Sequence, residues 1–202
     1  MKNNNLKTMS YFALLLALEF IFCFTILGSV PLGPVVATTS MIPVIVASLG
    51  LGLKRGFLLG LIWGFISLFI WTVMPPNPAT AFLFTPFYQT AQFKGNIGSL
   101  LASIVPRIFT GVTPILVYKA LKRFVGDKTS LIISAGVGSL TNTVMMMLIW
   151  FIFFSAQIES IVDQGIMLFI GSTVVMNGIP EMILCMVVCP IVAVVLRDKF
   201  LV

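Results

Sequence analysis

The stretch that decides the fold is residues 56–74, which read GFLLGLIWGFISLFIWTVM and carry no charged side chain. A helix of this length, rising about 1.5 Å per residue, matches the roughly 30 Å hydrocarbon core of a bilayer. Across the whole chain, 59% of the residues are hydrophobic and 9% are charged, whereas soluble domains carry about 25% charged residues. The sequence therefore predicts an integral membrane protein.

Similar apolar stretches recur along the 202 residues and predict an all-α, polytopic membrane fold with six transmembrane helices. The predicted spans lie at about 9–27, 39–53, 56–74, 100–118, 131–155 and 166–196. With short loops they fill the chain 1–202 as a single six-helix membrane domain. Because further spans follow the first, we expect it to be retained as a helix rather than cleaved as a signal peptide.

The basic residues predict the orientation of these spans. Those that fall on one side of a six-span arrangement are Lys2, Lys7, Lys54, Arg55, Lys119, Lys122, Arg123, Lys128, Arg197 and Lys199. The opposite side receives Lys94, Glu159 and Asp163. By the positive-inside rule, we expect both termini in the cytoplasm and a multi-pass protein of the bacterial plasma membrane. This topology explains the net charge of +6 without a nucleic-acid partner.

Several classes of chemistry are disfavoured by the composition. The chain contains no histidine, the commonest general base and metal ligand. Cys185 and Cys189 share a helix face, but two thiols alone do not make a zinc site, so we interpret the cysteines as small buried apolar residues. No phosphate-binding loop and no nucleophile–base pair is recognisable. We therefore expect no metal, no cofactor, no catalytic residue and no enzymatic activity in this chain.

Two faces of small residues predict close helix contacts. The glycines of 56–64 (GFLLGLIWG) recur at i,i+4 spacing and form a smooth groove for another helix. Ala13 and Ala17 form a second small face, either for internal packing or for docking of a separate subunit. Glu19 points broadly away from these alanines at about 100° per residue. If Glu19 faces the bundle, the alanines face outward, which favours docking.

A few polar side chains lie deep in the predicted spans, where each is costly unless it has a partner. They are Glu19, Arg107, Asn142, Asn177 and Glu181. Counted at about 1.5 Å per residue, the first four fall at one level between the midplane and the outer half, with the last one turn deeper. This arrangement predicts a ligand pocket open to the outside. The alternative is a structural cluster in which a glutamate pairs with Arg107.

The local sequence supports a pocket. Pro106 precedes Arg107, and Pro180 within NGIPE (177–181) predicts a helix break at the polar level, which is tolerated where helices line a cavity. Thr141 adds a donor and acceptor beside Asn142. A permanently charged arginine can hold a carboxylate with two hydrogen bonds, so we expect a small anionic or strongly polar ligand.

Two predicted outer loops differ in character. Loop 28–38 is uncharged and rich in glycine and proline, whereas loop 75–99 is long and aromatic. Because aromatic side chains seek burial, Phe84 and Tyr88 argue against disorder in the longer loop. We expect it to fold over the outer mouth, with simple packing onto the helix ends as the alternative.

These features together resemble one membrane protein family. The motifs are Ala13-x-x-x-Ala17, Pro106-Arg107, GSLTNT (138–143) and NGIPE (177–181), in the context of six spans with both ends inside. In order and spacing they resemble the substrate-binding S components of energy-coupling factor (ECF) vitamin transporters. Residues 39–47 and the aromatic segment 82–87 are most similar to the pantothenate-type branch.

The resemblance implies a division of labour along the chain. An S component captures a water-soluble vitamin from outside, and its alanine face, here Ala13 and Ala17, docks on a transmembrane coupling protein (EcfT-like). Two cytoplasmic ATPases use ATP to drive the cycle. The residues assigned to the ligand are Arg107, Asn142, Asn177 and Glu181, with Phe84 and Tyr88 as gate or wall.

Other functions remain open on the sequence alone. The same polar groups suit pyridoxine, hydroxymethylpyrimidine, folate or riboflavin. A self-sufficient secondary transporter with Glu19 or Glu181 as proton relay is a further alternative. It predicts uptake by this chain alone, driven by the proton gradient.

Overall fold

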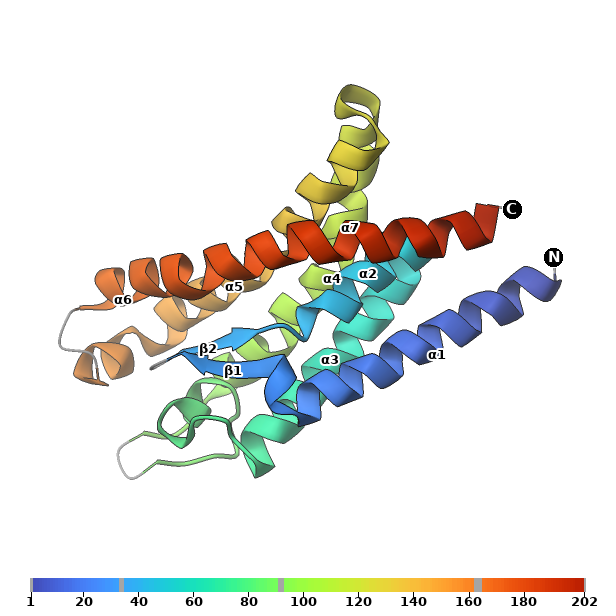
Figure 1. The fold of residues 1–202 in the computed structure, drawn as a ribbon. Coiled ribbons are helices and arrows are strands. Elements are labelled where there is room, and N and C mark those ends of the chain that lie inside the picture. Colours follow the sequence, from blue (N-terminus) through green and yellow to red (C-terminus); the bar gives the residue numbers. More distant parts are fainter. Residues whose placement is uncertain (1, 33–34, 91–92, 162–164, 202) are drawn as a thin grey trace.

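The computed structural model is a bundle of helices whose two termini lie at the same end (Figure 1). It describes residues 2–32, 35–90, 93–161 and 165–201. The long helices are α1 (Lys2–Phe24), α3 (Leu53–Val73), α4 (Ile97–Val125), α5 (Asp127–Ile161) and α7 (Ile179–Leu201). The shorter elements are η1 (Ile26–Gly28), β1 (Ser29–Leu32), β2 (Val35–Thr38), α2 (Met41–Leu51), η2 (Pro78–Leu83), α6 (Ile166–Thr173) and η3 (Val174–Gly178).

The predicted helical membrane fold is confirmed in its main features. Among the described residues, five helical segments are long and apolar enough to cross a membrane. The predicted span 39–53 is a shorter apolar helix, because α2 has 11 residues. At about 1.5 Å per residue it is about 17 Å long, which is less than a bilayer core.

The loop 28–38 differs from the irregular segment that its glycines and prolines suggest. β1 and β2 pair as an antiparallel hairpin, with Ser29 opposite Thr38 and Leu32 opposite Val35. Below it, the Ser40 hydroxyl donates to the Gly28 carbonyl at 3.0 Å, which joins the two ends of the hairpin. The hairpin therefore continues the short helix α2 toward the end of the bundle opposite the termini (Figure 1).

Helices α4 and α5 extend beyond the predicted spans 100–118 and 131–155. Hydropathy detects only the apolar part of a helix, whereas capping decides where it begins and ends. Asn96 caps α4 in a reciprocal capping box with Ser99, and Gly126, at a φ of 79°, separates α4 from α5. A residue with a side chain would be strained at that positive φ.

The predicted break around Pro180 takes a different form. Residues Ile166–Leu201 run as α6, the π-helical segment η3 and α7 in succession. Proline lacks an N–H and collides with the preceding turn of a regular α-helix. A π-helical turn has wider hydrogen-bond spacing, and such turns are a common cause of local helix distortion. The helix therefore accommodates Pro180 by widening just before it rather than by stopping.

The glycine face of α3 packs on α4. A Cβ added to Gly56 would lie 2.2 Å from the carbonyl oxygen of Gly111, and one added to Gly111 would lie 2.1 Å from that of Gly56. One turn along, a Cβ on Gly60 would lie 2.4 Å from the carbonyl oxygen of Arg107. Glycine is therefore required for this approach of the two backbones. The contact also sets the position of Arg107.

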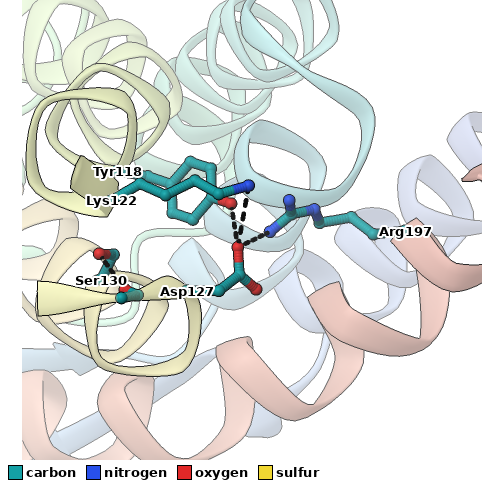
Figure 2. Close-up of polar contacts among 6 residues, drawn as sticks. Tyr118, Lys122, Asp127, Ser130 and Arg197 are labelled. Atoms are coloured by element: carbon teal, nitrogen blue, oxygen red, sulfur yellow. Dashed lines mark hydrogen bonds and ion pairs between the residues drawn. The ribbon is translucent and has the colours of Figure 1, made fainter.

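At the end that carries the termini, Asp127 connects three helices (Figure 2). Its carboxylate accepts a hydrogen bond from Tyr118 on α4 and lies 3.2 Å from the Lys122 ammonium. The Arg197 guanidinium of α7 lies 3.6 Å from the same oxygen and stacks 4.7 Å from the centre of the Tyr118 ring. These contacts join the ends of α4, α5 and α7.

Candidate functional site

Two apolar clusters meet at Arg107 on α4. One is centred on α2 and includes Trp63 of α3, and the other contains the η2 segment and includes Phe84. The guanidinium carbon of Arg107 lies 5.2 Å from the Trp63 ring centre and 5.7 Å from that of Phe84. Arg107 is 3% exposed. It is therefore a buried cation between two aromatic faces.

The hydrogen bonds of Arg107 leave it without an ion pair. Its guanidinium donates to the Ala102 carbonyl at 2.6 Å and to the Ser67 hydroxyl at 3.2 Å, while Nε has no partner. Within the described part of the chain, the ion pairs within 4.0 Å all involve Asp127. Among these residues, therefore, no glutamate pairs directly with Arg107, as the structural alternative from the sequence would require.

The aromatic segment 82–87 reaches the same place from the loop after α3. Phe84 stacks on Trp71 at 4.0 Å between ring centres and meets Trp150 of α5 edge-on at 5.2 Å. Ser99 donates to the Phe82 carbonyl at 2.6 Å. The loop is therefore folded onto the bundle with Phe84 inside, at the end opposite the termini (Figure 1). Tyr88 is half-buried against the same cluster.

Asn142 and Asn177 lie on neighbouring elements. Asn142 of α5 is one helical turn from Met146, whose sulfur lies 3.8 Å from the Arg107 guanidinium. Asn177 belongs to η3, and a Cβ on its neighbour Gly178 would lie 3.2 Å from the Thr143 methyl group. The packing thus brings η3 onto α5 at the level of Asn142. Both asparagines are buried, and the Oδ1 atom of each lacks a partner.

Glu181 follows η3 by one helical turn and contacts the hairpin. Its Oε1 accepts a hydrogen bond from the backbone N–H of Thr38. Glu181 also interacts electrostatically with Arg107, without direct contact. Glu181 is therefore already bonded to protein at one oxygen, unlike the two asparagine oxygens.

This centre does not include Thr141, Ala13 or Ala17. Thr141 is half-buried, and its hydroxyl donates to the Val137 carbonyl of its own helix at 2.7 Å, so Thr143 and not Thr141 faces η3. Ala13 and Ala17 are exposed on α1, while Glu19 is fully buried. The alanine face therefore points away from the bundle.

Sequence reasoning missed three side chains that contact Arg107 or Phe84. Trp63 and Trp150 are nearly fully buried and belong to the aromatic surround of Arg107 and Phe84. Ser67 carries no sequence signal of its own. It lies on α3, one turn from Trp63, and its hydroxyl accepts a hydrogen bond from Arg107. The glycine repeat of 56–64 could have shown that both α3 residues lie beside a helix contact, although it does not show that the partner is α4.

Some buried polar atoms, several of them on the predicted site residues, have no hydrogen-bond partner. Those among the described residues include Glu19 Oε2, Arg107 Nε, Asn142 Oδ1, Trp150 Nε1 and Asn177 Oδ1. Buried polar atoms in folded proteins almost always have partners, so a group of exceptions needs an explanation. Hydroxyls of Ser48, Ser134 and Ser139 and one Arg197 nitrogen are also without a hydrogen-bond partner, so these atoms are not confined to the predicted site residues.

Comparison with known proteins identifies related chains. A family model described as "ECF transporter, substrate-specific component" matches residues 7–193. The pantothenic acid transporter PanT of Lactococcus lactis subsp. cremoris (strain MG1363) is 32% identical over 155 residues, which cover 76% of this chain and 74% of the relative. Both findings agree with the resemblance that the sequence motifs indicate.

Proposed function

Because the chain belongs to the family of substrate-specific components of ECF transporters, we propose that it is the subunit that captures pantothenate for import. It is a multi-pass membrane protein. In the proposal it sits in a bacterial plasma membrane and takes the vitamin from the outer side. The similarity to a pantothenic acid transporter supports pantothenate over the other vitamins.

One observation supports the choice of an anionic ligand. Arg107 is buried between Trp63 and Phe84 and has no carboxylate within ion-pair distance. A buried cation is costly unless a counter-charge and hydrogen bonds satisfy it. Pantothenate carries one carboxylate together with hydroxyl and amide groups. In the proposal the carboxylate binds Arg107, and Asn142 and Asn177 bind the uncharged polar groups.

The other predicted residues have separate roles in the proposal. Phe84 forms a wall of the ligand site, and Tyr88 and Thr141 lie at its margin. Glu181 holds the hairpin close to the site through Thr38. The exposed Ala13 and Ala17 dock on a transmembrane coupling protein, and two cytoplasmic ATPases supply the energy from ATP. The basic side chains around Asp127 and Arg197, near both termini, support a cytoplasmic location for that end.

Binding to the purified chain in detergent tests the proposal. Calorimetry would compare pantothenate with folate, riboflavin, thiamin, biotin, pyridoxine and hydroxymethylpyrimidine. We expect pantothenate to bind near one-to-one with a nanomolar to low-micromolar Kd. Pantothenyl alcohol, in which a neutral alcohol replaces the carboxylate, is the matched control and should bind more weakly. A tight one-to-one complex with a different vitamin would show that pantothenate is wrong, and no binding to folded protein would reject vitamin capture.

Uptake by cells tests the partners. We expect pantothenate uptake only when the chain is produced together with a coupling protein and the two ATPases. Uptake by the chain alone that collapses with the proton gradient would instead support a self-sufficient transporter.

A further inference from the structure

Glu19 is a second buried charged group whose surroundings need an explanation. It lies on α1, is 0% exposed, and shares its helix face with the buried Leu15 and Cys23, one turn to either side. The opposite face of this part of α1 carries the exposed Ala13 and Ala17. The carboxylate therefore points into the bundle, where α1 packs on α2 and α3.

The protein itself satisfies only part of this carboxylate. Oε1 accepts a hydrogen bond from the Cys23 thiol at 3.1 Å, and Oε2 has no partner. A thiol is a weak donor, and a carboxylate can accept several hydrogen bonds. Leaving such a group under-bonded in a membrane-spanning bundle is costly. The free oxygen is therefore available for a hydrogen bond to a group from outside the chain.

Arg107 is a candidate partner of opposite charge but does not fill this role. It interacts electrostatically with Glu19, yet the two side chains form no ion pair within 4.0 Å. Opposite charges in a medium of low dielectric attract strongly. Instead of meeting, each keeps one unpartnered atom, Oε2 on Glu19 and Nε on Arg107. A polar molecule that bonds to both groups explains why each is left incomplete.

We propose that Glu19 is a specificity-determining residue of the ligand site, whose free carboxylate oxygen accepts a hydrogen bond from a hydroxyl group of the substrate. This inference rests on the proposed function and deepens it. The substrate then has two recognised ends, a carboxylate at Arg107 and a hydroxyl-bearing end at Glu19. A simple carboxylic acid without hydroxyls would gain no hydrogen bond at Glu19. Glu19 thus selects hydroxylated acids.

A thermodynamic cycle between protein and ligand tests this role. The probes are pantothenate and two analogues, each with one of its hydroxyls replaced by hydrogen. We expect Glu19→Gln to weaken pantothenate binding by about 10-fold, because the amide oxygen that replaces the carboxylate oxygen is a weaker, neutral acceptor. We also expect it to reduce the preference for pantothenate over one of the two analogues. Glu159→Gln, the same change at an exposed glutamate of α5, is the matched control and should alter neither quantity.

The outcomes separate this inference from the proposed function. If the unsubstituted protein binds pantothenate and Glu19→Gln leaves the preference over both analogues unchanged, the role of Glu19 is overturned while vitamin capture stands. If the unsubstituted protein does not bind pantothenate, both are overturned. Glu19→Leu provides a second variant should the amide impair folding, and the same change in preference is expected. An equal loss of affinity for all three ligands would show that Glu19 acts only on the structure.

Discussion

Gly56 of α3 and Gly111 of α4 face each other so closely that a Cβ on either would lie 2.2 or 2.1 Å from the other's carbonyl oxygen. The contact continues at Gly60, which lies against the backbone of Arg107. Gly60 of the neighbouring helix α3 therefore helps to position Arg107, the charged residue at the centre of the candidate site.

Gly60→Ala should weaken both the fold and the site, because its methyl group would collide with the Arg107 carbonyl oxygen and push α4 away from α3. We expect a lower unfolding temperature in detergent and weaker pantothenate binding. Gly171→Ala is the control, since a Cβ there meets nothing within 4 Å. If the two variants behave alike, the close contact is not what positions Arg107.

Arg107→Ala should weaken pantothenate binding by about 10-fold or more, since the bond of a cation to the ligand carboxylate is lost. The loss should be much smaller for pantothenyl alcohol, which has no carboxylate. Calorimetry with both ligands measures the difference. Unchanged affinity in a folded variant, or an equal loss for both ligands, would assign Arg107 to structure.

Tryptophan at both Ala13 and Ala17 should abolish ATP-driven uptake and leave pantothenate binding intact. These alanines are exposed and lie on the opposite side of α1 from Glu19. The control places tryptophans at Ile183 and Val187, which are also exposed and one turn apart on α7, and should preserve uptake. Loss of binding in the alanine variant would indicate that the face serves internal packing.

Glu181→Ala should free the hairpin, because its carboxylate accepts the backbone N–H of Thr38. Hydrogen exchange followed by mass spectrometry should show faster exchange at the end of β2. Glu181→Gln keeps an acceptor oxygen and should exchange at an intermediate rate. Equal exchange in all three proteins would mean that other contacts hold the hairpin.

Asp127→Asn should lower the unfolding temperature only slightly and leave pantothenate binding unchanged. Asp127 and Lys122 are each about half exposed, and ion pairs at such positions contribute little. The cluster in Figure 2 is also at the end of the bundle remote from the candidate site. A large loss of binding would reveal coupling between that end and the site.

Local composition was enough for part of this picture. The uncharged run 56–74 predicts a membrane helix, and α3 (Leu53–Val73) follows it closely because a long apolar helix satisfies its own backbone in lipid. The family could also be identified from the sequence, because it is marked by motifs in a fixed order along the chain, such as NGIPE (177–181). The residues with candidate roles, Arg107 and Glu19 among them, also stood out because charges are rare in such helices.

Only the tertiary structure decided how these parts meet. Nothing in the local pattern shows that the glycines of α3 pack on α4, that Arg107 lies between Trp63 and Phe84 without an ion pair, or that Glu181 bonds to the backbone of Thr38. Each of these contacts joins residues far apart in the sequence. Hydropathy and helical period describe one helix at a time, whereas such contacts depend on how all the helices pack together.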